Sequence, residues 1–471
     1  MEGLVMIGQV PTRATREQFQ ILKDEPVYEV VSKFASIADM QEIDGWARSF
    51  YTIEGHIESI MQYRKPLLPE PDEPAWTEAK ASVMYDVMTS IPRVRSLSFI
   101  NQLDDVPYES SSAAGYGYAG KKGEGDNFKR AKSITNALVR TYVERCAKGE
   151  KQEALKSVIT ECTPDVAFTR TQLARLPSIK VRNVFGEAFH YILIEGLSAS
   201  PLLEAFKRAD TFYVTGKDPT TYVPRFLSHL DNQPGWVVAL DWSRFDATVQ
   251  LWEIDHAFQC LENVLDFPEE YSRACFFLSK ELFKKRKLAA PDGVMWMRTS
   301  GIPSGSYFTN LIGSIINYTR IKFLCNKLGY QMGEVRVQGD DSVFKAQAPN
   351  KPDVYAIAQA VADFGWELNP AKCVVTHNTD GLTFLGRGQY QLFNIRERLK
   401  VLRLLCFPEY EVDDPMISTA RVKMICNDAG FRDMMYNKIY LAMNRLYGEA
   451  ETVPDRYKTY VDLNDWQDVN M

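Results

Sequence analysis

The tripeptide Gly339-Asp340-Asp341 constrains this chain more than any other feature. Apolar residues flank it at strand spacing, and glycine supplies the tight bend that a β-hairpin needs. Such a hairpin presents two adjacent carboxylates at its tip, where they repel each other unless cations neutralise them. The pattern therefore predicts a site for divalent metal ions. Two other acidic pairs are interpreted as solvated surface: Asp104-Asp105 and Asp413-Asp414.

A third carboxylate follows an apolar run that is typical of a buried strand, Trp236 to Leu240, and this carboxylate is Asp241. A side chain at the end of a buried strand is held rigidly, as a metal ligand must be. The alternative is an N-cap for a following helix. Together with the hairpin, Asp241, Asp340 and Asp341 are expected to bind two Mg²⁺ ions, with Mn²⁺ as a substitute, because hard cations prefer oxygen ligands. Two such ions can activate a hydroxyl nucleophile and stabilise a leaving pyrophosphate.

Composition bounds the class of protein. The chain has 471 residues, 45% hydrophobic and 25% charged, which is ordinary for a globular protein of two or three domains or one multi-lobed fold. Its net charge of −6 argues against a uniformly basic nucleic-acid binder but allows a local basic channel. The eight cysteines form no Cys-x-x-Cys pair, which argues against a zinc site or a disulfide framework. No apolar run is long enough to cross a bilayer, and the N-terminus lacks a signal-peptide pattern.

Helical and strand periodicity alternate irregularly along the chain, which predicts an α+β fold. Helices are expected at 251–265, 310–327, 353–364 and much of 415–447. Strands are expected at 179–185, 236–241, 333–338 and 342–346. The proline-rich segment 64–76 is predicted to be an extended connector, and the segment 109–126, rich in Ser, Gly and Tyr, a loop. The last eighty residues are predicted to form a helical lobe.

Three segments resemble, in order, palm motifs A, B and C of a viral RNA-dependent RNA polymerase: Asp241 to Asp246, Thr299 to Asn310 (TSGIPSGSYFTN) and Gln338 to Ser342 (QGDDS). The likeness is to the partitivirus and picobirnavirus group of double-stranded RNA viruses, and it runs from about residue 110 to about residue 390. Each motif alone is a weak signal, but the three in order at this spacing are specific.

The resemblance implies a right-hand polymerase with an antiparallel palm sheet, closed into a cup. The implied regions are an N-terminal bracing region 1–80, fingers 81–235 and 247–300, palm 236–246 and 301–392, and thumb 393–471. The implied reaction is template-directed RNA synthesis from NTPs, which replicates or transcribes the viral genome inside the virion or in the host cytoplasm. Template and product RNA and a capsid protein are the implied partners. Two alternatives remain: a reverse transcriptase, and a catalytically decayed RNA-binding protein associated with the capsid.

Sugar selection is implied at motifs A and B. The ribose-sensing set is Asp246, Ser304 and Thr309, since a carboxylate can accept a hydrogen bond from the 2′-hydroxyl that distinguishes RNA from DNA. Many relatives carry asparagine where this chain has Gly313, so Asn310 or Asn317 is a candidate substitute. Asp246, and Gln338 in place of an aromatic residue, argue against a reverse transcriptase.

Residues 173–184 resemble motif F, and this resemblance implies that cations in the segment bind the triphosphate. Arg175, Lys180 and Arg182 are the candidates, because the arginine fork matches phosphate oxygens. The alternative is a solvated strand face. Lys372, in a segment that resembles motif D, is the candidate proton donor to pyrophosphate. An ordinary surface lysine is the alternative.

RNA contacts are implied at three further places. Residues 382–387 resemble motif E, which supports the growing 3′ end, and residues 112–117 resemble motif G near the template. The template-binding candidates are Ser112, Gly115, Tyr116, Lys121, Lys122 and, in motif B, Gly305. The basic run 280–287 fits a nucleic-acid channel and a solvated helix face about equally.

Overall fold

The computed structural model describes residues 2–11, 16–48, 50–178, 180–430, 432–454 and 457. Its helices are α1 (Glu25–Phe34), α2 (Ile37–Asp44), α3 (Ile53–Met61), α4 (Pro74–Ser90), α5 (Asn127–Ala147), α6 (Lys151–Thr160), α7 (Phe189–Arg208), α8 (Pro219–Asp231), α9 (Phe245–Thr248), α10 (Leu251–Glu262), α11 (Glu270–Lys284), α12 (Thr309–Leu328), α13 (Val354–Ala362), α14 (Arg398–Cys406), α15 (Pro415–Asp428) and α16 (Met434–Tyr447), with a 3₁₀ turn at Leu103–Asp105. Its strands are β1 (Leu4–Gln9), β2 (Trp46–Ala47), β3 (Val94–Arg95), β4 (Asp165–Thr171), β5 (Ala174–Arg175), β6 (Val181–Gly186), β7 (Trp236–Ala239), β8 (Leu265–Asp266), β9 (Arg286–Ala289), β10 (Val294–Arg298), β11 (Gln331–Gln338), β12 (Asp341–Gln347), β13 (Val374–Thr376), β14 (Gly388–Tyr390) and β15 (Phe393–Ile395).

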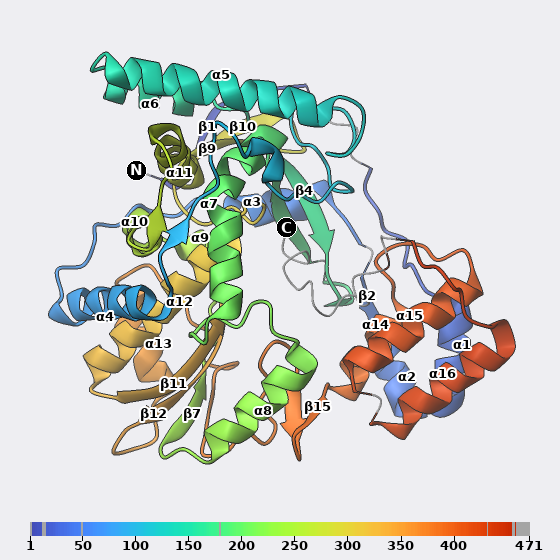
Figure 1. The fold of residues 1–471 in the computed structure, drawn as a ribbon. Coiled ribbons are helices and arrows are strands. Elements are labelled where there is room, and N and C mark those ends of the chain that lie inside the picture. Colours follow the sequence, from blue (N-terminus) through green and yellow to red (C-terminus); the bar gives the residue numbers. More distant parts are fainter. Residues whose placement is uncertain are drawn as a thin grey trace.

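The four-stranded sheet carries the hairpin that the sequence singles out. Its order is β11-β12-β7-β13, and every pairing is antiparallel. Helix α12 lies against β11, and α8 lies near β14 and β15 at the lower edge of Figure 1. Helices α4 and α10 pack on α12, so the apolar faces of these helices and of the sheet join in one core. This core fixes the sheet from which the hairpin tip projects.

A second, five-stranded sheet joins distant parts of the chain in the order β1-β10-β9-β4-β6. Strand β1 pairs antiparallel with β10, and β4 pairs parallel with β9. Helix α3 packs on β6, where the Cβ that Gly55 lacks would lie 3.5 Å from Val181 Cγ2. Helices α5 and α7 pack together, with α11 against both (Figure 1).

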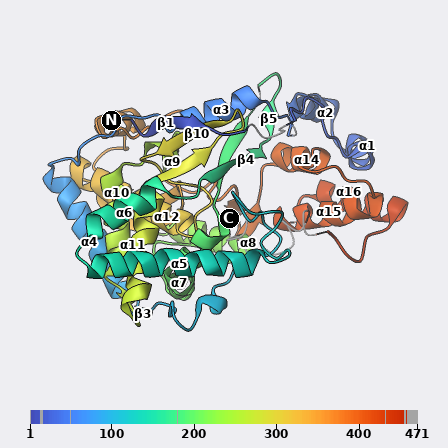
Figure 2. The ribbon, with the colours of Figure 1, turned by 90° about the horizontal axis from the view of Figure 1, so that it is seen from above.

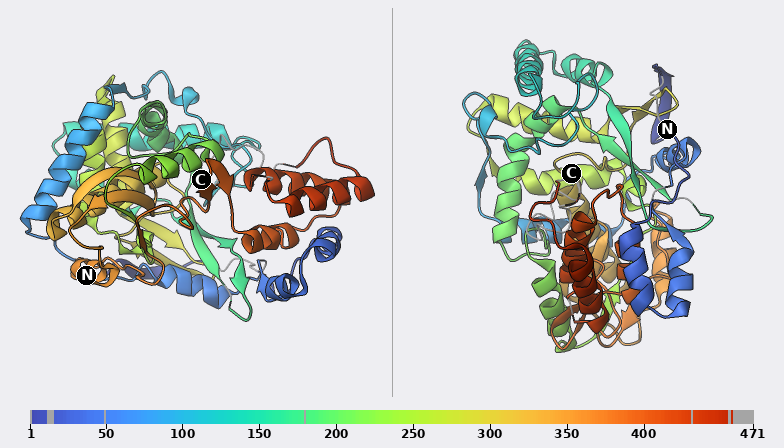
Figure 3. Two further views of the ribbon diagram at one scale, coloured as in Figure 1. Left: turned by 90° about the horizontal axis from the view of Figure 1, so that it is seen from below. Right: turned by 90° about the vertical axis from the view of Figure 1, so that its right-hand side faces the viewer.

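The C-terminal helices form a lobe with the N-terminal ones. Helices α14, α15 and α16 share a hydrophobic core with α1, and Ile43 of α2 joins it. The blue and red helices project to one side in Figure 2 and in the left view of Figure 3, and the right view of Figure 3 shows them side by side, facing the viewer. The N-terminal region thus contacts this lobe through α1 and α2, and the five-stranded sheet through β1 and α3. The closed cup and the domain boundaries stay predictions.

The predicted elements correspond closely to the observed ones. The helices expected at 251–265, 310–327 and 353–364 are α10, α12 and α13, and the region 415–447 contains α15 and α16. The strands expected at 236–241, 333–338 and 342–346 are β7, β11 and β12. In the strand expected at 179–185, Ile179 lies outside the described residues, and β6 covers the remainder. Among the described residues, no helix has both the length and the apolarity that a membrane span requires.

Candidate active site

The three predicted metal ligands lie at the ends of adjacent strands. Val238 of β7 pairs with Phe344 of β12, and the same register continued by three residues places Asp241 opposite Asp341. Gly339, at φ +59°, forms the turn between β11 and β12, a conformation that glycine adopts without strain. Asp340 is exposed at the tip of this turn, whereas Asp241 and Asp341 are half-buried. The folding of one sheet therefore brings residues a hundred positions apart together.

The charges at this tip act on one another. The pKa of Asp341 rises to about 7, first because burial disfavours the charged form and next because Asp340 and Asp241 are negative neighbours. The pKa of Asp340 is also raised, although this residue is exposed at the tip. The largest cause is the loss of solvation beside the surrounding protein; Arg182 opposes the rise in pKa, and Asp241 adds to it. Carboxylates that repel in this way are suited to binding cations.

Arg182 and Asp246 lie beside this cluster. Arg182 Nη2 donates to Asp246 Oδ2 at 3.3 Å, which joins strand β6 to the short helix α9. Burial raises the pKa of Asp246 to about 6, with Arg182 opposing and Asp340 assisting the rise. The pKa of Arg182 is raised by Asp246 in the first place, and Asp340 adds to the effect. The structure thus brings together one predicted triphosphate ligand, one predicted ribose sensor and the hairpin.

A tight turn after Asp241 directs Asp246 to its place. Arg244 has φ +53°, an uncommon conformation for a residue with a side chain, and such strain occurs at functional sites. Arg244 Nε donates to Glu367 Oε2 at 2.8 Å, and Lys65 Nζ donates to Glu367 Oε1 at 2.7 Å. One carboxylate therefore ties the turn to the N-terminal region.

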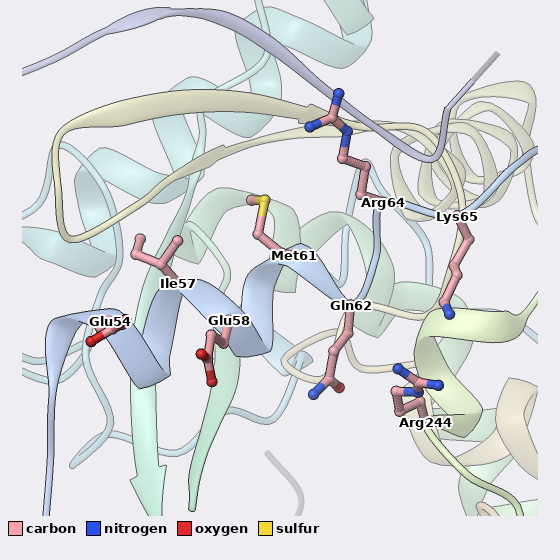
Figure 4. A pocket seen from close by; sticks show the side chains of 8 residues that line it. All are labelled: Glu54, Ile57, Glu58, Met61, Gln62, Arg64, Lys65 and Arg244. Carbon is pink, nitrogen blue, oxygen red and sulfur yellow. The ribbon is translucent and has the colours of Figure 1, made fainter.

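A pocket of about 510 Å³ opens beside this turn. Its lining residues are Glu54, Ile57, Glu58, Met61, Gln62, Arg64, Lys65 and Arg244. Figure 4 shows Lys65 and Arg244 at one end of the pocket and Glu54 at the other, along α3. Lys65 and Arg244 share the carboxylate of Glu367, whereas Arg182 pairs with Asp246 and interacts electrostatically with Asp340, which places Arg182 beside the predicted metal ligands.

The donor set fits Mg²⁺ in its chemistry. All three ligands are carboxylates, and this ion is usually held by one or two carboxylates together with substrate phosphates. In the described ranges, no three His, Cys, Asp or Glu side chains form a group that could hold an ion by themselves. Water or substrate oxygens would therefore complete the coordination. Asp241, Asp340 and Asp341 remain the predicted ligands.

The motif B residues have partners within the protein. Ser304 Oγ accepts a hydrogen bond from the Phe185 N–H at 3.1 Å, and the Thr309 hydroxyl donates to the Pro303 carbonyl. A Cβ on Gly305 would lie 1.8 Å from the Phe185 carbonyl oxygen, so glycine is required there for close approach to β6. Packing thus explains Gly305 without RNA. The ribose and template roles of these residues stay predictions.

The motif G loop is braced internally. Lys122 Nζ donates to Ser112 Oγ at 2.8 Å, and burial lowers the Lys122 pKa. Gly115, at φ +90°, leaves no room for a Cβ beside the Glu187 carbonyl. Lys121 is exposed and Tyr116 is half-buried. Of this group, Lys121 is the best placed to meet a phosphate, and the template role stays a prediction for all.

The remaining predicted cations, Arg175, Lys180 and Lys372, are exposed. Arg175 is 3.5 Å from Glu42 of α2, and Lys180 is exposed. Lys372 is exposed in a turn that contacts Asp241: the Asn369 N–H donates to the Asp241 carbonyl at 2.9 Å. The proton-donor role of Lys372 and the triphosphate roles of Arg175 and Lys180 stay predictions.

Two features were missed by reasoning from the sequence. Lys400 of α14 acts electrostatically on Asp341, and the Leu385 N–H donates to Asp341 Oδ2 at 3.1 Å. Helix α12 contacts the hairpin turn through Ser314 and Asn317. No motif marks Lys400. The three-residue spacing of Ser314 and Asn317 on a helix was a usable signal, because it places both on one face.

Comparisons with known proteins place this chain among relatives. The viral RNA-dependent RNA polymerase family profile matches residues 24–444. The RNA-directed RNA polymerase of Atkinsonella hypoxylon virus is 25% identical over 316 residues, 56% of this chain and 48% of that protein. The RNA-directed RNA polymerase of White clover cryptic virus 1 is 28% identical over 131 residues, 23% of this chain and 21% of that protein. The chain therefore spans about half the length, or less, of these curated relatives.

A crystal structure of the RNA-dependent RNA polymerase of a human picobirnavirus has the same fold. Its TM-score is 0.66 at 16% identity, with 94% of this chain and 90% of that one covered. An insertion-loop deletion mutant of the same polymerase gives a TM-score of 0.66 with 91% and 88% covered. The predicted α+β right-hand polymerase fold is confirmed.

The chain belongs to the family of viral RNA-dependent RNA polymerases. The resemblance to the partitivirus and picobirnavirus group, read from motifs A, B and C, is thereby confirmed.

Proposed function

We propose that this chain synthesises RNA on an RNA template by two-metal nucleotidyl transfer, for the replication or transcription of a double-stranded RNA virus genome. The observation that carries the proposal is the convergence of Asp241 with Asp340 and Asp341, beside the Arg182–Asp246 pair. Two bound Mg²⁺ ions would supply activation of the 3′-hydroxyl and stabilisation of the leaving pyrophosphate. Asp241, Asp340 and Asp341 would hold those ions.

The remaining residues position the nucleotide. Arg182 offers a guanidinium to the triphosphate, and this attraction orients the α-phosphate for attack by the 3′-hydroxyl. Asp246 offers a carboxylate oxygen to the ribose 2′-hydroxyl, which favours NTPs over dNTPs. Lys372 is proposed to give a proton to pyrophosphate, and Lys400 to offset negative charge beside Asp341.

RNA and NTPs are the partners that this function requires. Association with a capsid protein, and work inside the virion or in the host cytoplasm, are proposed from family likeness alone.

The test is primer-free synthesis on single-stranded RNA with Mg²⁺, in which NTPs are compared with dNTPs. Asp340→Asn is expected to lower synthesis by roughly 10³-fold, the scale of losing preorganised charge stabilisation in an active site. RNA binding is expected to persist, because contacts to the phosphate backbone dominate affinity. Asp413→Asn, the same change in an exposed acidic pair, is the matched control.

Two outcomes would overturn the proposal. A preference for dNTPs would identify a reverse transcriptase. If Asp340→Asn left every measurable activity intact, the chain would be an RNA-binding protein with a decayed catalytic site.

A further inference from the structure

The strand ladder stops short of the catalytic carboxylates. The last pair between β12 and β7 is Phe344 with Val238, and each of these residues is three positions along its strand from Asp341 or Asp241. Like charges at the ends of these strands repel each other, and the ladder does not oppose this repulsion there. Some other contact must hold the two ends at a fixed spacing.

Helix α12 holds the hairpin end through the backbone N–H and the backbone carbonyl of Gly339. The Gly339 N–H donates to Ser314 Oγ at 2.8 Å, and Asn317 Nδ2 donates to the Gly339 carbonyl at 3.0 Å. Ser314 Oγ in turn donates to the Asn310 carbonyl at 2.7 Å, which leaves its lone pairs directed to Gly339. Ser314 and Asn317 have no solvent exposure. The turn before Asp340 is thus fixed by a rigid helix.

The same asparagine reaches the other end. Trp242 Nε1 donates to Asn317 Oδ1 at 2.8 Å, and Trp242 directly follows Asp241. Because an indole N–H can only donate, this contact sets the amide so that its NH₂ group faces Gly339. Trp242 is 5% exposed, so water does not compete for the contact. The Asn317 side chain therefore links Trp242 and Gly339, the residues next to Asp241 and Asp340.

We propose that Asn317 is a positioning residue that sets the spacing between Asp241 and the Asp340-Asp341 pair, and through it the affinity of this site for divalent cations. The inference rests on the proposed function. Outer-shell contacts of this kind orient metal ligands, and their loss typically lowers metal affinity or activity by 10–100-fold.

The geometry also assigns Asn317 a role other than the ribose contact. Both ends of its amide are engaged within the protein, and the side chain is fully buried. It therefore does not replace the asparagine that many relatives carry at the position of Gly313. Asn310 Oδ1 accepts a hydrogen bond from Thr215 Oγ1 at 3.4 Å and remains half-buried.

The experiment measures Mn²⁺ binding by calorimetry without RNA or NTP, with Asp340→Asn defining the background. Asn317→Ala removes both contacts, Trp242→Phe removes the contact beside Asp241, and Ser314→Ala removes the contact to the Gly339 N–H. Asn326→Ala, an exposed asparagine on the same helix, is the matched control. Thermal unfolding, kcat and the KM for NTP are measured on the same proteins.

Asn317→Ala is expected to weaken Mn²⁺ binding at the Asp340-dependent site by about tenfold and to lower kcat, with KM for NTP little changed. Trp242→Phe is expected to weaken Mn²⁺ binding and lower kcat by smaller factors. Asn326→Ala is expected to change neither. If Asn317→Ala does not fold, Trp242→Phe and Ser314→Ala decide the question.

The inference is overturned if the folded variants bind Mn²⁺ as the wild type does, whatever their stability, or if the wild type has no Asp340-dependent site. Failure of the proposed function is a separate result: the wild type would make no RNA, while the difference in Mn²⁺ affinity would still be measured.

Discussion

The carboxylates at the Gly339 hairpin and those around Arg286 differ in what neutralises them. At the hairpin, Asp340 raises the pKa of Asp341, and Asp241 raises the pKa of both; the cationic neighbours, Arg182 and Lys400, lie on other elements. In the core, Arg286 Nε lies 2.8 Å from Asp165 Oδ1, and its Nη1 pairs with Glu187.

The core cluster is closed to solvent. Arg286, Asp165 and Glu187 are each 1% exposed at the side chain. Burial raises the pKa of Glu187 well above its ordinary value, and Arg286 opposes the rise. Nearby, Glu195 accepts hydrogen bonds from Ser306 Oγ at 2.9 Å and from the Tyr307 N–H at 2.7 Å, which anchors the part of motif B that leads into α12.

The two acidic clusters differ in what the loss or gain of a cation does to them. In a buried cluster with a cation at its centre, the loss of one partner destabilises the fold, because it leaves a buried charge without compensation. A cluster at a hairpin tip, with its cations on neighbouring elements, can accept further cations.

Arg286→Met is expected to lower the free energy of unfolding by about 3–5 kcal/mol, because Asp165 and Glu187 stay buried without their cation. Chemical denaturation measures this, with the half-buried neighbour Lys285→Met as control. A variant as stable as the wild type, but deficient in synthesis, would show that this cluster serves activity and not stability.

Arg182→Ala is expected to raise the KM for NTP by about tenfold, since a hydrogen bond to a charged group contributes about 1.5–3 kcal/mol. Stability is expected to change little, because Arg182 is about half exposed. Steady-state kinetics measure the effect, and Arg175→Ala, whose guanidinium lies beside Glu42, is the control. An equal rise for both variants would contradict the assignment of the triphosphate to Arg182.

Lys400→Ala is expected to lower synthesis by about threefold at low salt and by less at high salt, because an exposed charge is screened by solvent ions. Synthesis rates at two ionic strengths measure it, with Lys33→Ala, an exposed lysine of α1, as control. If the loss of synthesis were the same at both ionic strengths, Lys400 would not act through its charge.

The basic run 280–287 shows where reasoning from the sequence stopped. It left a nucleic-acid channel and a solvated helix face equally open, yet Arg286 is in the core and Lys284 Nζ donates to Asp255 Oδ1 at 2.9 Å. Charge pattern says nothing of which face a residue presents, because burial of an arginine depends on acids from distant strands. Arg175 and Arg182 look alike in sequence, and only strand pairing separated them.

The order of residues along the chain determined the Gly339 hairpin, the strand ending near Asp241, the main helices and the family, because these rest on local periodicity and short motifs. Tertiary structure alone decided that Arg182 meets Asp246, that the charge of Lys400 acts on Asp341 and that Asn317 joins Trp242 to Gly339. Each of these contacts joins elements far apart in sequence, and its geometry exists only once the sheets and helices have packed.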